Sequence, residues 1–172
     1  LSNVVNKNVT NMSYMFDGVK SMTDLDLSSF WGSNVSKMSY MFARDKHLSV
    51  DMHYFDTSNV TDISAFFRDS TDVKISIPSF NTSNVTDMSY IFAGYVGDIQ
   101  PMLTSFDTSN VTSMNSMFAN YTGALDLTSF DTSNVTSMNS MFNKYKGGDL
   151  DLTSFDTSNV TSMNAMFANY TG

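Results

Sequence analysis

An Asn-Val step recurs seven times along this chain, and successive copies stand 24–26 residues apart. Apolar residues fall at the same places in each copy, so each repeat reads as one supersecondary unit. A unit this short cannot bury its apolar face alone, and stacking on its neighbours covers that face. The sequence therefore predicts a single solenoid over residues 1–172, in which the first of the seven repeats is partial. The steps are Asn8-Val9, Asn34-Val35, Asn59-Val60, Asn84-Val85, Asn110-Val111, Asn134-Val135 and Asn159-Val160.

The apolar spacing changes character within each repeat. Residues 125–127 read Leu-Asp-Leu, and alternation with period two predicts a very short strand with both leucines on one face. Then follow, at steps of three or four, Val135, Met138, Phe142 and Tyr145, a spacing that predicts one face of a short helix. Between the two stands Asp-Thr-Ser-Asn, four residues that favour turns. Each repeat is expected to run strand, turn, helical segment and return loop.

Stacking such repeats predicts an α/β repeat solenoid. Short parallel strands line one face of the expected coil and short helical segments the other, and the alternative is a mostly-β solenoid. At a strand spacing of about 4.8 Å, the seven coils make a rod or arc about 30 Å long. Pro101 replaces the first leucine of the strand in one repeat and cannot donate to a ladder, so a local bulge is expected there.

The composition limits the classes of partner and fold. All 17 acidic residues are aspartates, and Gln100 is the one glutamine, so long polar helix formers are scarce. The net charge of −8 argues against a nucleic acid partner, which needs clustered lysine and arginine. There is no cysteine, and neither a disulfide nor a thiolate metal site is expected. No apolar run reaches membrane-spanning length, so membrane insertion is not expected either.

Both ends of the chain interrupt the repeat pattern. The chain begins inside one repeat and stops after Tyr170-Thr171-Gly172, without a polar capping element. Solenoids need such caps to cover their terminal apolar faces. We therefore expect these residues to be a fragment of a longer array.

The most regular part of the repeat reads Phe-Asp-Thr-Ser-Asn-Val-Thr-x-Met-x-x-Met-Phe, as at residues 106–118, 130–142 and 155–167. This motif resembles the 26-residue bacterial surface protein repeat, in the BspA-like branch of the leucine-rich repeats. The resemblance covers essentially the whole chain from Asn8 onward. It implies a leucine-rich-repeat-like coil on secreted or wall-anchored bacterial proteins, many of which are described as adhesins. Family members often carry cysteine in the return loop, where this chain has tyrosine.

The resemblance and the repeats together predict a non-catalytic extracellular scaffold, either an adhesin-like stalk or a ligand-binding array at the cell surface. Its expected partner is a protein or glycan of a host or neighbouring cell. One alternative is a self-assembling filament whose chains associate end to end. A second is an accessory carbohydrate-binding region of a larger enzyme. Catalysis within the chain is not expected, because His47 and His53 do not recur and a Ser-His-Asp reading of His53 with Asp51 lacks a pocket.

Tyrosines in the return loops are the candidate ligand-binding residues. Aromatic side chains exposed in a row stack on sugars or peptides. Their helical register with Phe142 equally allows half-burial at the rim of the core, and this alternative stays open. The four residues are Tyr95, Tyr121, Tyr145 and Tyr170.

Two columns of aspartates are candidate Ca²⁺ ligands, with no other cofactor expected. Like charges about 5 Å apart repel, and a hard cation with oxygen ligands relieves the repulsion. A turn aspartate also satisfies backbone N–H groups by itself, which is the alternative. The Asn-x-Ser/Thr triplet of each repeat is formally a glycan acceptor, and the alternative is an asparagine cap or ladder. The calcium candidates are Asp126, Asp151, Asp131 and Asp156.

Overall fold

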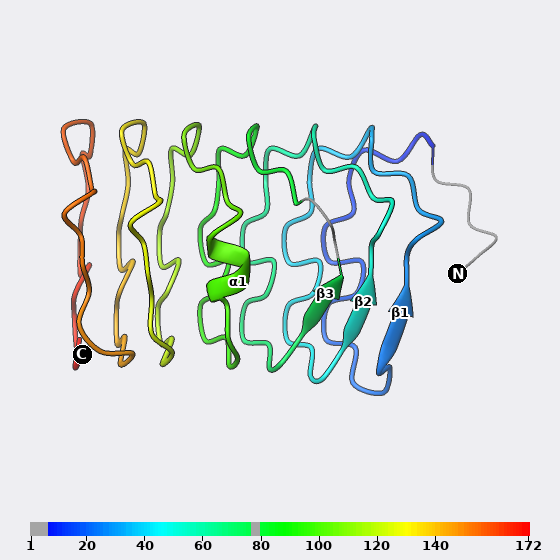
Figure 1. Ribbon diagram of the computed structural model, residues 1–172, viewed down its shortest axis with the longest axis horizontal. Helices are drawn as coiled ribbons and strands as arrows, with labels where there is room; N and C mark the ends of the chain where they lie inside the picture. The colour runs from blue at the N-terminus through cyan, green and yellow to red at the C-terminus, as the bar shows by residue number, and fades with distance from the viewer. Residues whose placement is uncertain (1–6, 77–79) are drawn as a thin grey trace.

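The computed structural model describes residues 7–76 and 80–172. Figure 1 shows the chain advancing coil by coil along its long axis, so that residues 24–26 apart in sequence lie side by side. Ile77, which the sequence places as the second apolar residue of a strand, lies outside the described residues, as does the start of the first partial repeat.

Three consecutive repeats form a parallel sheet. Its strands are β1 (Asp24–Asp26), β2 (Ser49–Asp51) and β3 (Lys74–Ser76), in the order β1-β2-β3. Leu25 pairs with Val50 and Val50 with Ile75, so the register keeps the same repeat position aligned. These strands stand where the period-two pattern predicts them, and the central residues of β1 and β2 are buried while their neighbours are exposed. The strand that the same pattern predicts at residues 125–127 is not formed, and that prediction is wrong.

The fourth full repeat replaces its strand with one helical turn, α1 (Gln100–Leu103). Pro101 lies in the first turn of this helix, where its missing N–H needs no partner. The side chain of Gln100 then pairs with the next coil as a strand would. Its Oε1 accepts the N–H of Asp126 at 2.9 Å and its Nε2 donates to the Asp126 carbonyl at 3.2 Å. The bulge expected at Pro101 is therefore a helical turn. The Gln100 side chain makes the two hydrogen bonds to the next coil that a strand backbone would otherwise make.

The segments expected to be short helices are runs of turns. In the repeat at residues 138–145, Ser140 and Lys144 have φ of 55° and 57°, in the left-handed region that a right-handed helix excludes. Met141 N–H donates to Met138 and Tyr145 N–H to Phe142, three residues back. Steps of three thus bring apolar side chains to one face, which is why the spacing resembles that of a helix.

The other amides of the same segment bond to the neighbouring coil. Met138, Ser140 and Phe142 donate to the carbonyls of the residues 24 positions later, at 2.9, 2.8 and 2.9 Å. The preceding coils make equivalent bonds, and a line of parallel bridges follows one repeat position through all of them. In a helix these amides would donate to carbonyls four residues earlier, within the same repeat. Here they join the coils instead.

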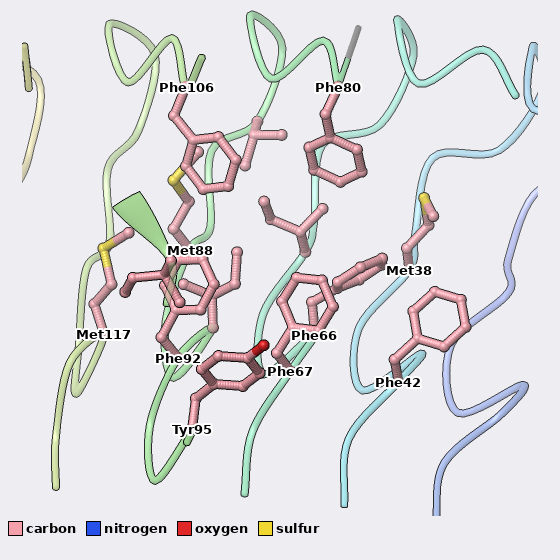
Figure 2. Close-up of a cluster of buried hydrophobic side chains, with 14 of the residues drawn as sticks. Met38, Phe42, Phe66, Phe67, Phe80, Met88, Phe92, Tyr95, Phe106 and Met117 are labelled. Atoms are coloured by element: carbon pink, nitrogen blue, oxygen red, sulfur yellow. The ribbon is translucent and has the colours of Figure 1, made fainter. Parts of the chain in front are cut away.

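A ladder of phenylalanine rings runs through the core (Figure 2). Phe67 stacks on Phe92 with centroids 5.8 Å apart, and Phe92 on Phe118 at 6.1 Å. Phe118 in turn stacks on Phe142 at 5.8 Å. Methionines such as Met88 fill the space beside the rings and are fully buried. The coils therefore share one apolar core rather than each enclosing its own.

Candidate functional site

The return-loop tyrosines point inward. Tyr95, Tyr121 and Tyr145 are at most 2% exposed, and Tyr170 is partly buried. Each phenol donates to a backbone carbonyl of the preceding coil: Tyr121 to Gly97 at 2.9 Å and Tyr145 to Gly123 at 3.0 Å, for example. Their rings are thus not available to stack on a ligand. The alternative, in which these tyrosines pack at the rim of the core, therefore describes them. Each hydroxyl contacts a loop carbonyl of the neighbouring coil.

Burial also governs the ionisation of these phenols. Removal from water raises the pKa of Tyr95 and of Tyr145 to about 12, and it raises the pKa of Tyr121 as well. The phenols of Tyr95, Tyr121 and Tyr145 therefore stay protonated and keep donating at any physiological pH.

The candidate calcium ligands are occupied by their own turns. Asp126 Oδ1 accepts the N–H and the hydroxyl of Thr128 at 3.0 and 2.6 Å, and Asp151 binds Thr153 in the same way. Asp131 and Asp156 each accept an N–H two residues on, at 2.9 Å. These bonds hold the pKa of all four carboxyls below its ordinary value. Within residues 7–76 and 80–172, no three acidic, histidine or cysteine side chains gather as a metal site requires.

The asparagine of the triplet tethers neighbouring coils. Asn134 Nδ2 donates to the Ser109 carbonyl at 2.7 Å, and Asn159 Nδ2 to the Ser133 carbonyl at the same distance. The same bond occurs from Asn34 onward in each repeat. The asparagines form a ladder with backbone acceptors, which uses the amide nitrogen that a glycan would modify.

The two histidines make surface contacts. The backbone N–H of His53 donates to Asp51 Oδ1 at 3.0 Å, while its imidazole packs edge-on against Tyr54 with centroids 4.9 Å apart. His47 Nδ1 lies 3.6 Å from Asp72 Oδ2, and both side chains are more than half exposed. Asp51 therefore holds the backbone of a turn rather than orienting the His53 ring.

Sequence reasoning missed the exposed aromatic residues of the N-terminal half. Trp31 is 58% and Tyr54 is 76% exposed, and both line a groove of about 520 Å³ together with Ser28, Ser29 and Phe30. A search for residues that recur in every repeat overlooks Trp31 and Tyr54, because each differs from the residue that other repeats carry at its position. Departure from the repeat is the signal that finds them.

A second row of surface side chains runs across four consecutive coils and consists of Tyr14, Tyr40, Arg68 and Tyr90. Tyr14 stacks on Tyr40 with ring centroids 4.6 Å apart and planes 7° from parallel. Arg68 donates from Nη1 to the Tyr40 hydroxyl at 3.4 Å, and its guanidinium lies 5.1 Å from the centre of the Tyr90 ring. Ala65 stands in the tyrosine column between them, and the arginine spans the gap.

One buried carboxyl also escaped sequence reasoning. Asp45 occupies the column that later holds the tyrosines, and it is fully buried. Its Oδ1 accepts the N–H of Val19 at 2.6 Å, while Oδ2 has no hydrogen-bond partner among the described residues. Burial, with the charge of Asp17 adding to it, raises the pKa of Asp45 to about 6. Asp17 is itself paired with Arg44.

Together these features define a repeat protein whose stacked coils share one core. Some departures from the repeat lie on its surface, as at Trp31 and Tyr54, and others inside it, as at Asp45. Residues 1–100 and 96–172 both match the family described as "Mycoplasma protein of unknown function, DUF285". The chain belongs to this family. No curated protein and no solved structure matches it. In the described part of the chain, no helix is long and apolar enough to cross a membrane.

Proposed function

We propose that the chain is a solenoid that serves as a non-catalytic, extracellular surface scaffold, of the BspA-like kind that its repeat motif resembles. In this role the coils act as a stalk or array that holds ligand-binding side chains away from the cell. The partner is a protein or glycan of a host or neighbouring cell. The family description, which names Mycoplasma, agrees with a bacterial source.

The observation that carries the proposal is the continuity of coil-to-coil bonding. Bridges join one repeat position from Asn11 to Ser162 without a break, and the phenylalanine ladder accompanies them from Phe16 to Phe167. A stack bonded throughout its length resists bending, and neighbours in it cannot slip without losing both bonds and core. Such a body suits the presentation of a surface better than it suits a closing active site.

The exposed side chains support the same role. Two of the departures from the repeat, Trp31 and Tyr54, lie on the outside, where they leave the core columns beside them unchanged. Variation of this kind alters the surface without altering the fold, as in other repeat proteins that bind along an extended face.

Immunolabelling of intact cells tests the surface role. An antibody raised against the purified fragment should label non-permeabilised cells of the bacterium that carries the gene, while an antibody against a cytosolic enzyme should not. Labelling that requires permeabilisation would contradict the proposal. Sedimentation of the purified fragment tests the alternative of end-to-end assembly, which predicts a mass that grows with concentration.

A further inference from the structure

The groove beside Trp31 and Tyr54 is the part of the surface that the fold explains least. These are the most exposed of the large apolar side chains among residues 7–76 and 80–172. They come from adjacent coils and face the same groove of about 520 Å³. This volume falls within the range of about 300–1,000 Å³ that small-ligand pockets occupy.

The other repeats show that the coil needs neither aromatic side chain. At the position of Trp31 the later repeats carry Asp56, Asn81, Asp107, Asp131 and Asp156. At the position of Tyr54 four other repeats carry Ser29, Ser105, Ser129 and Ser154. Polar residues therefore satisfy the fold at both places. Both aromatic rings are largely exposed and line one groove, an arrangement that favours a ligand-binding role.

A third departure fixes the backbone beside the tryptophan. Gly32 stands where later repeats have threonine, and a Cβ there would lie 2.6 Å from the Phe55 ring and 2.0 Å from the Asp56 carbonyl oxygen. The glycine thus lets the chain next to Trp31 press against the following coil. The three departures Trp31, Gly32 and Tyr54 gather in one place.

The lining defines the chemistry of the ligand. Trp31 and Tyr54 offer aromatic surface, and the faces of such rings carry the negative part of a quadrupole that attracts C–H groups. The Ser28 hydroxyl donates to Asp26 Oδ1 at 2.5 Å, which turns its oxygen toward other groups as an acceptor. Aromatic faces beside hydroxyl oxygens match a pyranose ring, which presents C–H groups on its faces and hydroxyl donors at its edge.

The charges near the groove narrow the chemical class of the ligand further. No charged side chain is among the described residues that line the groove. An acidic sugar would find no charged partner among these side chains, and the Lys7 ammonium beside them already packs over an aromatic ring. The Lys7 ammonium lies 5.2 Å from the centre of the Trp31 ring and leaves the tryptophan 58% exposed. The groove therefore suits an uncharged ligand.

We propose that this groove binds a neutral saccharide, with a pyranose ring stacked on Trp31 or Tyr54 and a hydroxyl donating to Ser28. The inference rests on the proposed scaffold role and names the ligand class of one of its surfaces. The saccharide proposal and the scaffold proposal can fail separately, because saccharide binding is measured on the purified protein and surface display is measured on cells.

The single tryptophan of the chain makes the test direct. Cellotriose, maltotriose and triacetylchitotriose are titrated into the purified fragment while the fluorescence of Trp31 is followed. At least one of these neutral trisaccharides should change the emission saturably, and trigalacturonate should bind more weakly. No saturable change with any neutral trisaccharide, or tighter binding of trigalacturonate, would overturn the proposal. So would an emission change that depends only on protein concentration, which indicates a second copy in the groove.

Repeat-derived variants separate the site from the fold. W31D and Y54S install residues that other repeats carry at these positions, so both should keep the wild-type circular dichroism spectrum. Calorimetric titration should show a loss of affinity of about tenfold or more in each. Y90S is the matched control, since Ser116 and Ser140 stand in the Tyr90 column and Tyr90 lies outside this groove. Unchanged affinity in the W31D/Y54S double variant, or equal loss in Y90S, would contradict the assignment.

Discussion

The phenol of Tyr145 donates a hydrogen bond of 3.0 Å to the carbonyl oxygen of Gly123, which belongs to the return loop one coil earlier. The contact leaves no room for a side chain at Gly147, two residues after Tyr145 in the same loop. A Cβ at Gly147 would lie 2.3 Å from the same hydroxyl and 1.9 Å from the same carbonyl oxygen. The tyrosine thus bonds across coils to a backbone carbonyl, and a glycine in its own loop lets the two loops approach each other.

Loss of the phenol should weaken the stack. Y145F keeps the ring but leaves the Gly123 carbonyl without this donor, so we expect the free energy of unfolding to fall by about 1–2 kcal/mol. Urea denaturation measures the change. Y54F removes an exposed phenol and should shift stability by less than about 0.5 kcal/mol. Equal effects of the two variants would contradict the role assigned to Tyr145.

The left-handed residues provide a test of the turn geometry. Lys144 has φ of 57°, a conformation that costs a side-chain-bearing residue about 1–2 kcal/mol and glycine almost nothing. K144G should therefore be neutral or raise the free energy of unfolding by up to about 1 kcal/mol in thermal or urea unfolding. Gly94 already holds this position in another repeat.

The neighbouring residue supplies the control for K144G. Asn143 is not among the residues with positive φ, so N143G should lower stability by about 0.5–1 kcal/mol through the flexibility it adds to the unfolded chain. If these segments were helical, both glycine variants would destabilise by similar amounts. That outcome would contradict the observed turns.

Asp45 should make stability depend on pH in an unusual direction. Its folded pKa of about 6 lies above the ordinary value of 3.8, so the folded state binds more protons between these values. Stability is then highest with Asp45 protonated and falls as the pH rises through about 6, by up to about 1.4 kcal/mol per pH unit. Urea denaturation at several pH values measures this. D45N keeps an acceptor for the Val19 N–H and should remove the slope.

The turn aspartates affect stability at lower pH than Asp45 does, and they make stability rise with pH rather than fall. Hydrogen bonds from the following serine or threonine hold the pKa of Asp107 and Asp126, among others, below 3.8. Their contribution is present above that value and is lost as the pH falls through the lower folded pKa. Stability should therefore peak near pH 4. A profile that rises steadily from pH 4 to pH 7 would contradict the assignment for Asp45.

Much of this architecture can be predicted from the repeat. The columns named from sequence, such as Val135 and Met138, are fully buried, and β1, β2 and β3 lie where alternation predicts strands. The segment ending at Tyr145 was predicted wrongly as helical, because turns three residues long produce the same apolar spacing as a helix. Only the partners of the backbone amides tell the two apart, and those partners lie in another repeat.

The site was harder to predict than the fold for a related reason. Tyr95 and its equivalents recur, and recurrence drew attention to them, but recurrence marks residues that the coil itself needs. Their phenols meet carbonyls that sequence spacing does not reveal. Trp31 and Tyr54 occur once each in their columns and are exposed. The proposed saccharide site therefore depends on residues that break the repeat pattern.

Scalar couplings across hydrogen bonds, measured by NMR on the isotope-labelled protein, test the stacked coils most directly. The amide nitrogen of Phe118 should couple to the carbonyl carbon of Met141, since its N–H donates to that oxygen at 3.0 Å. The equivalent amides of other coils, such as those of Phe92 and Phe142, should couple to carbonyls 24 or 25 residues later. Coupling of Phe118 to the carbonyl of Met114, as in a helix, would contradict the account.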